Sequence, residues 1–246
     1  MAGLKDAEAL MHWIASLSLP DNTHDFMSVS LHHPNEYAIN EGRIISDTGL
    51  DISIHEFDVH FKEFQVSYSN ALHCKLDNKT YLVGPLSRVN NNFGCLPSEL
   101  KNLIAHIGLE FPNKNMYYSI HARAIEIYYA VLESIRILEN YAVPEFSKVV
   151  IQPQAGVGYG CTEAPRGMLW QKYELDQQGA VKAVQIVPPT SQNQARIEED
   201  LRYSLEKFGL DKNEKELRLY SETLIRNYDP CIYCSTHFLD LRINHL

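Results

Sequence analysis

The longest run of regularly spaced apolar residues lies between Ile120 and Leu138, and it limits the folds open to this chain. Apolar side chains recur there at steps of three and four residues: Ile120, Ala124, Ile127, Val131, Ile135 and Leu138. This spacing places them on one stripe of an amphipathic α-helix, which Asn140 and Pro144 end. At about 1.5 Å per residue, such a helix can run through the middle of a domain. We therefore expect a central helix with this stripe buried.

Shorter patterns surround the long helix. Apolar spacing and stop signals predict helices over residues 5–17, 98–108, 191–209 and 215–226, with Ser98 as a cap and Ser191 and Gln194 as a capping box. Turn residues between alternating segments predict hairpins near residues 43–54 and between 169–175 and 181–187. We expect an α+β fold that is mainly helical, with a long central helix and small antiparallel hairpins. It should form a single domain over residues 1–246.

Composition narrows the class of protein. The chain is 45% hydrophobic and 22% charged, which is typical of a globular protein, and its net charge is -9. A negative chain without a basic stripe argues against binding nucleic acid. The most apolar long stretch carries five charged or ionisable side chains, so it should not span a membrane. No signal peptide is recognisable, and five cysteines do not form a disulfide framework, so we expect a cytoplasmic protein.

The most informative motif is Asp229-Pro-Cys-Ile-Tyr-Cys-Ser-Thr-His237. Two thiols three residues apart, Cys231 and Cys234, can bind one metal, and His237 is a third potential ligand. The same spacing fits a buried cysteine pair that binds nothing, or a zinc or redox module. The other cysteines are single, so a four-ligand zinc site would need residues from scattered segments.

Two further segments stand out. Gly156–Gly167 carries glycines that permit close backbone approach, followed by Glu163 and Arg166 as a charge pair; otherwise it is a tight loop with a surface ion pair. It lacks the lysine of a phosphate-binding loop. Val187–Asn193 is a rigid stretch whose helix N-terminus could face an anion, or could simply be capped.

In this order, the three segments resemble the C-terminal part of the large subunit of nickel-iron hydrogenases, in its cytosolic multisubunit branch. The matching motifs are Glu163-Ala-Pro-Arg-Gly167, Pro189-Thr190 with Gln192-Asn193, and Asp229-Pro-Cys-x-x-Cys-x-x-His237. Stretches 40–46, 69–73, 81–90 and 122–141 extend the resemblance over nearly the whole chain. The family's N-terminal Arg-x-Cys-Gly-x-Cys element, which supplies two nickel thiolates, has no counterpart here.

The resemblance implies a role for each motif residue. Cys231 would be a terminal nickel ligand and Cys234 would bridge nickel and iron. His237 and the backbone carbonyl of Ile186 would bind a magnesium ion. Arg166 would lie over the open face of the metals, while Pro189 and Thr190 would line the pocket of a cyanide on iron. Carbon monoxide would be the iron's other diatomic ligand.

Two departures from the family pattern matter. Gln171 stands where the family usually has a histidine, four residues beyond the glycine of the Glu163–Gly167 motif. Nine residues, Phe238 to Leu246, follow His237, where a maturation protease usually removes the family's tail.

Two functions follow from the resemblance. The first is a piece of a hydrogenase catalytic subunit, oxidising dihydrogen reversibly to protons and electrons. It would need a separate chain that supplies the other two thiolates, and a small subunit with iron-sulfur clusters. The alternative is a non-catalytic, hydrogenase-like scaffold subunit of a redox complex. Loss of the N-terminal cysteines favours the scaffold, whereas retention of Cys231, Cys234, His237, Arg166 and Thr190 favours the enzyme.

Overall fold

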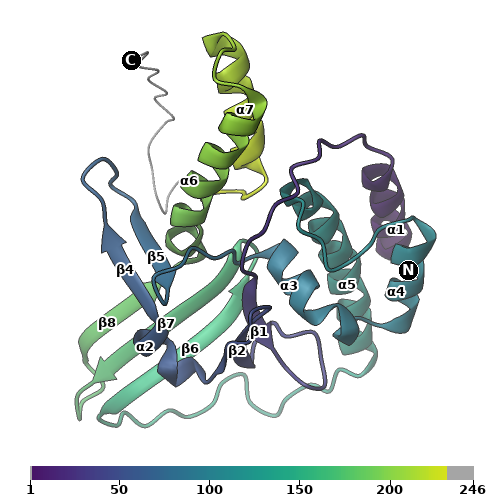
Figure 1. The fold of residues 1–246 in the computed structure, drawn as a ribbon. Helices are drawn as coiled ribbons and strands as arrows, with labels where there is room; N and C mark the ends of the chain where they lie inside the picture. Colours follow the sequence, from purple (N-terminus) through teal and green to yellow (C-terminus); the bar gives the residue numbers. More distant parts are fainter. Residues whose placement is uncertain (1, 232–246) are drawn as a thin grey trace.

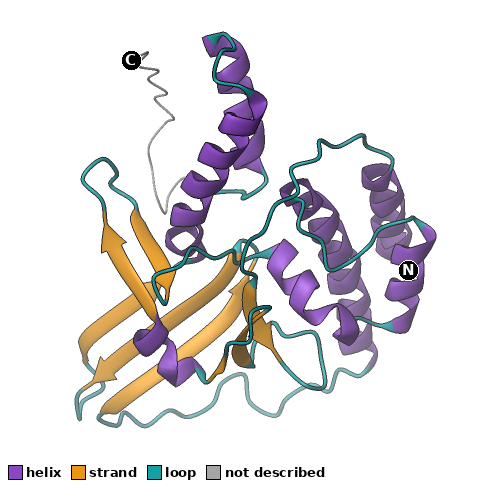
Figure 2. Ribbon diagram, in the orientation of Figure 1, coloured by secondary structure: helices purple, strands orange, loops and turns teal. Residues whose placement is uncertain are grey.

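The computed structural model describes residues 2–231, which form seven α-helices and three small antiparallel sheets. This confirms the expected α+β fold. Most helices and most strands occupy different sides of the molecule (Figure 2). The α-helices are α1 (Ala2–Ala15), α2 (Phe57–His60), α3 (Pro85–Asn92), α4 (Ser98–His106), α5 (Ser119–Glu139), α6 (Pro189–Phe208) and α7 (Glu214–Arg226). The short 3-10 helices are η1 (Ile54–Glu56), η2 (Phe93–Cys95) and η3 (Met116–Tyr118).

Helix α5 is the centre of the helical side, where α1, α3 and α4 pack around it (Figure 1). Its buried face carries Ala122, Ala124, Ile125 and Tyr128, so Ala124 is the only fully buried residue of the expected stripe, while Ile120 and Val131 are partly buried against the same core. Ile127 is 45% exposed and Leu138 is 73% exposed, so the predicted burial is wrong at both positions. Apolar residues lie on several faces of this helix, and spacing alone could not choose among them. Its last turn also extends beyond the helices that pack on it.

The strands form three separate sheets. They are β1 (Val29–His32), β2 (Arg43–Ser46) and β3 (Asp51–Ile52); β4 (Phe61–Gln65) and β5 (Leu72–Leu76); and β6 (Gly156–Ala164), β7 (Gly167–Leu175) and β8 (Val181–Val187). Both expected hairpins, β2–β3 and β7–β8, are confirmed. The segment 156–167, for which a tight loop was one of two interpretations, is mostly strand β6. Nine residue pairs in register with β7 outweigh the low strand propensity of its glycines.

An aromatic core lies under the third sheet. Trp170 of β7 is fully buried and stacks on Phe57 at a ring separation of 4.5 Å. Phe57 stacks in turn on Phe61 at 4.2 Å. The Trp170 indole N–H donates to the carbonyl of Ile54 over 2.8 Å, so this buried polar group is satisfied. These contacts fix β7, and therefore the turn that precedes it, against the rest of the molecule.

Helix α6 begins two residues earlier than its sequence suggests. Pro188 is the N-cap and Pro189 the first helical residue, where a proline's missing N–H costs nothing. Ser191 therefore lies inside the first turn, and the expected Ser191–Gln194 capping box is wrong. Helix α7 does begin with a capping box, formed by Asn213 and Glu216. Among the described residues, no helix is long and apolar enough to cross a membrane.

Two substitutions on α5 test which of its faces is buried. We expect Ile125→Asp to lower the free energy of unfolding by at least about 3 kcal/mol, because an unpaired carboxylate replaces a fully buried side chain. Ile127→Asp, two residues away on the half-exposed face, should change it little. Urea unfolding followed by circular dichroism measures both. A stable Ile125→Asp variant, or an equal loss at Ile127, would show that another face is buried.

Candidate functional site

Arg166 lies on the tight turn between β6 and β7, and it contacts the segment that leads to Cys231. Its Nε donates to the backbone carbonyl of Asp229 over 2.7 Å and lies 3.2 Å from a carboxylate oxygen of the same residue. The expected charge pair between Glu163 and Arg166 is wrong, because Glu163 points into the protein and binds Arg88. The turn therefore presents Arg166, 40% exposed, beside the residue two positions before Cys231.

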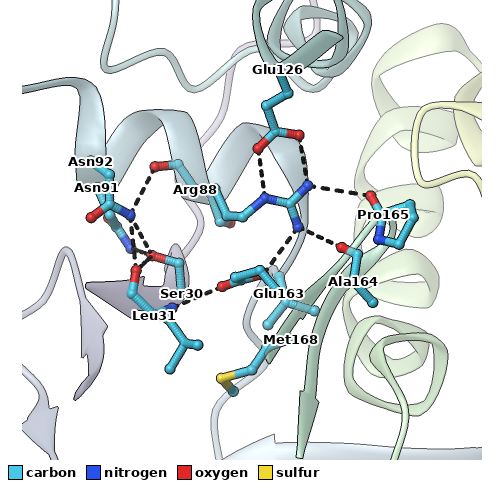
Figure 3. A network of polar contacts seen from close by, with 12 residues as sticks. Ser30, Leu31, Arg88, Asn91, Asn92, Glu126, Glu163, Ala164, Pro165 and Met168 are labelled. Atoms are coloured by element: carbon cyan, nitrogen blue, oxygen red, sulfur yellow. Dashed lines mark hydrogen bonds and ion pairs between the residues drawn. The ribbon is translucent and has the colours of Figure 1, made fainter. Parts of the chain in front are cut away.

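A buried arginine holds this turn from beneath (Figure 3). Arg88 of α3 is 3% exposed and pairs with both carboxylate oxygens of Glu126 of α5, each at 2.6 Å. Its Nη1 lies 3.0 Å from Glu163 and donates to the carbonyl of Ala164 over 2.8 Å. Its Nη2 also donates to the carbonyl of Pro165 over 3.3 Å. One side chain thus joins two helices to the turn that carries Arg166.

The network holds two carboxylates around one guanidinium. Burial raises the pKa of Glu163, although the charge of Arg88 and the backbone N–H of Leu31 oppose this. Tyr37 donates to Glu126 over 2.7 Å, and burial followed by the charge of Glu126 raises the pKa of the Tyr37 hydroxyl. These groups line one side of a cavity of about 410 Å³ that opens beside α5. The donors around the carboxylates compensate for their loss of water.

The start of α6 is locked against the same region. Gln192 donates to the carbonyl of Met168 over 2.6 Å, and Asn193 exchanges two hydrogen bonds with the backbone of Val83. The neighbouring Gly84 has φ +116, and a Cβ there would lie 2.9 Å from the carbonyl oxygen of Arg166. Backbone at residues 83–84 therefore lies between the turn of Arg166 and the first turn of α6.

Thr190 in that first turn is a buried polar residue without a partner. It is almost fully buried, and its Oγ1 makes no hydrogen bond to any described residue. A buried hydroxyl left unpaired costs on the order of 1–3 kcal/mol, so native proteins seldom leave one unless another group binds it. The residues here thus fit a further ligand that accepts a hydrogen bond from Thr190.

Three elements hold the backbone that precedes Cys231. Ser119 and Arg123 of α5 donate to the carbonyl of Asn227 over 2.6 and 2.7 Å. Tyr228 donates to Asp200 of α6 over 2.6 Å. Together with Arg166 at Asp229, these contacts fix the direction in which the chain enters the cysteine motif. Cys231 is partly exposed, and Cys234 and His237 lie outside the described residues.

The remaining predicted positions lie on and after strand β8. Ile186 is paired in register with Gln171, the residue that departs from the family pattern. Pro189 is the first residue of α6, three positions beyond Ile186. Within residues 2–231, no three side chains of the metal-binding types come together.

Sequence reasoning missed Arg88, Glu126 and Asp200. Arg88 falls in the stretch 81–90 that resembles the family, but nothing in a single sequence marks an arginine as buried. Glu126 and Asp200 read as ordinary polar positions on amphipathic helices, because charged residues are rarely fully buried unless they are paired. Only the pairing across distant segments identifies them.

Replacing Arg88 should be far more damaging than replacing an exposed arginine with a similar pair. We expect Arg88→Ala to cost about 3–5 kcal/mol of unfolding free energy, because two buried carboxylates lose their cation. Arg136, which pairs with Glu133 on the surface of α5, is the matched control, and Arg136→Ala should leave the unfolding midpoint unchanged. Equal effects of the two substitutions in urea unfolding would contradict the role given to Arg88.

Asp200 should make stability depend on pH in acid. Burial opposes its charge, but hydrogen bonds from His24 and Tyr228 outweigh burial and hold the pKa of Asp200 below its usual value. The stabilisation is complete above about pH 4, where an unfolded aspartate is ionised, and is lost as the pH falls through the lowered folded pKa. Asp200→Asn should therefore be less stable than the parent at pH 7, with the difference narrowing below pH 4. A difference that widens in acid in urea unfolding would contradict this.

Comparisons with known proteins point to one family. The family model described as nickel-dependent hydrogenase matches residues 55–237. Sulfhydrogenase 1 subunit alpha of Pyrococcus furiosus is 31% identical over 207 residues, which are 83% of this chain and 48% of that protein. The NAD-reducing hydrogenase HoxS subunit beta of Cupriavidus necator is 28% identical over 214 residues, or 80% of this chain and 44% of that protein.

Solved structures share the fold. An NAD+-reducing [NiFe]-hydrogenase in the H2-reduced state superposes with a TM-score of 0.71 at 20% identity, covering 95% of this chain and 56% of the other. A Ni-Fe-Se hydrogenase from Desulfomicrobium baculatum gives a TM-score of 0.68 at 19% identity, covering 95% and 59%. The chain spans about half the length of the relatives it matches. Since the family model covers most of its residues, the chain belongs to the nickel-dependent hydrogenase family and resembles its large subunit.

Proposed function

We propose that this chain is the part of a nickel-iron hydrogenase catalytic subunit that carries two of the four nickel thiolates. The reaction is the reversible oxidation of dihydrogen to protons and electrons, and a partner supplies the other two thiolates. The observation that carries this proposal is the contact between Arg166 and Asp229, which fixes a permanent cation beside the cysteine motif. A scaffold would not need an arginine at this position.

The residues fit the metal centre that the family implies. Cys231 and Cys234 would hold nickel and iron, while His237 and the carbonyl of Ile186 would hold magnesium. Pro189 and Thr190 would face a cyanide on iron, and the unpartnered Oγ1 of Thr190 supports this assignment. When bound, the metal centre would split dihydrogen. Its cyanide and carbon monoxide ligands would not come from the protein.

The chain itself contributes orientation and electrostatics. The Arg166 guanidinium has five N–H donors in a plane, and the carbonyl and carboxylate of Asp229 accept hydrogen bonds from part of this set. The rest of the donor set remains able to polarise a small molecule at the site. Arg88 prevents the turn from shifting, and Tyr228 with Asp200 holds the backbone before Cys231.

The proposal includes further proteins. The relatives are named as alpha, beta or A subunits of hydrogenases, so we propose that this chain works in a heteromeric complex. A small subunit with iron-sulfur clusters would carry the electrons, and a maturation protease would act on the tail after His237. We place the complex in the cytoplasm.

Substituting Arg166 tests the enzymatic role in the complex purified from cells that make this chain. We expect Arg166→Lys to retain nickel but to oxidise hydrogen at least about tenfold more slowly, because lysine keeps the charge and loses the planar multi-donor group. Cys231→Ser should lose nickel as well as activity. The measurements are nickel content and hydrogen-dependent dye reduction on the same preparation.

Arg136→Lys is the matched control, since Arg136 pairs with Glu133 on the surface of α5 and should not affect either measurement. Full activity of Arg166→Lys would remove the catalytic assignment. A parent complex that assembles but holds no nickel would favour the scaffold function instead.

A further inference from the structure

The sheet β6–β7–β8 has one covered face and one open face. Cys161, Trp170 and Val187 lie side by side in register and are all buried, so the face they share packs on the aromatic core. The next rows toward the β7–β8 turn on the opposite face are Gly160–Gln171–Ile186 and Gly158–Tyr173–Val184. Val184 is 53% exposed and Ile186 is 47% exposed.

The outer part of strand β6, residues 156–160, contributes no side chain to the open face, which further along the strand carries Thr162 and Ala164. Gly156, Gly158 and Gly160 all point there, and a Cβ added at any of them would meet nothing within 4 Å. Glycine weakens a strand, and in strand interiors it often marks a place where another backbone approaches closely. The open face is therefore flat along residues 156–160 of β6, and it carries Val184 and Ile186 on β8, with Tyr173 between them.

Charge distinguishes the two faces. The two open rows contain no charged side chain, whereas the solvent-exposed end of the other face carries Lys172 and Glu174 in its rows. The charge on the edge strand β8 is Lys182, which pairs with Glu174 near the β7–β8 turn, whereas Val184 and Ile186 leave the rest of the open face uncharged, as at the centre of an interface. Among the described elements, β8 packs closely only with β7. The pattern is that of a surface covered by another polypeptide.

The open face leads directly to the site. Its row Gly160–Gln171–Ile186 lies one residue from Val187 and three from Pro189, where α6 begins beside Thr190. The proposed site lacks two thiolates, and the relatives are about twice as long as this chain. A polypeptide that brings those thiolates to the site must pack next to Ile186.

We propose that the open face of β6–β7–β8 is the docking surface for the polypeptide that carries the other half of the hydrogenase large subunit. This inference rests on the proposed function for the identity of its partner. The backbone of that polypeptide packs against the three glycines of β6, Gly156, Gly158 and Gly160. Tyr173, Val184 and Ile186 form the apolar centre of the contact.

Site-specific photo-crosslinking tests the surface in cells that make the chain. p-Benzoylphenylalanine replaces Val184 on the open face or, as the matched control, Val157 on the other face, which is 50% exposed. After irradiation, crosslinked peptides are identified by mass spectrometry. We expect Val184 to give a crosslink to a polypeptide with an Arg-x-Cys-Gly-x-Cys element, at least about tenfold more abundant than from Val157.

A crosslink from Val184 to a second copy of this chain, to the iron-sulfur subunit or to any other protein would overturn the inference. Equal crosslinking from both positions, or none, would also overturn it.

A charge placed on the surface gives an independent measurement. Val184→Arg should reduce co-purification of the partner half at least about tenfold, whereas Val157→Arg should not, because only the former would bury an unpaired cation. Thermal unfolding of both variants verifies that each is folded. If Val184→Arg retains the partner, the docking surface lies elsewhere.

Nickel analysis of the parent complex separates this inference from the proposed function. A complex crosslinked as expected but without nickel would leave the docking surface correct and the enzymatic proposal wrong. A nickel-containing, active complex that does not crosslink through Val184 would support the enzymatic proposal and show that the docking surface is wrong.

Discussion

The buried pairing of Arg88 with Glu126 and Glu163 is the interaction on which the arrangement of this protein depends. It joins α3 and α5 on the helical side to the end of β6 on the sheet side. The two hydrophobic clusters are separate, one among the helices and one under the sheet. Because hydrophobic contacts are not directional, they would permit the two sides to shift. The fork of Arg88, with fixed donors to two carbonyls, does not permit this shift.

A buried network of charges such as Arg88, Glu126 and Glu163 contributes little net free energy to folding. Taking charged groups out of water costs several kcal/mol per ion, and apolar residues of similar volume often serve stability as well or better. The benefit here is geometric. Arg88 binds the carbonyls of Ala164 and Pro165, so the next residue, Arg166, projects from a backbone that cannot relax. The same logic applies to Asp200, which binds Tyr228 and thereby orients the backbone before Cys231.

Two features of the structure support the proposed partner and ligand. The rows Gly160–Gln171–Ile186 and Gly158–Tyr173–Val184 carry no charged side chain, and Thr190 is buried without a hydrogen-bond partner among the described residues. Both features lie near the residues that resemble the family's metal site. They agree with a chain that spans about half the length of its relatives. The described residues build two hydrophobic cores of their own.

The class of fold, the long helix, two hairpins and the three motifs of the family can be predicted from the amino-acid sequence alone. These depend on local periodicity, turn residues and motif spacing, which a single chain displays directly. Predictions from local sequence patterns were wrong where contacts between distant segments determine the structure. Pairing with β7 made a glycine-rich segment into strand β6, and packing against α1, α3 and α4 chose the face of α5 that is buried, leaving Ile127 outside it. The partner of Glu163 proved to be Arg88, 75 residues away, and not Arg166, three residues away. Only tertiary structure could select it, because the free energy of a buried ion pair depends on which distant groups replace the water that each charge has lost.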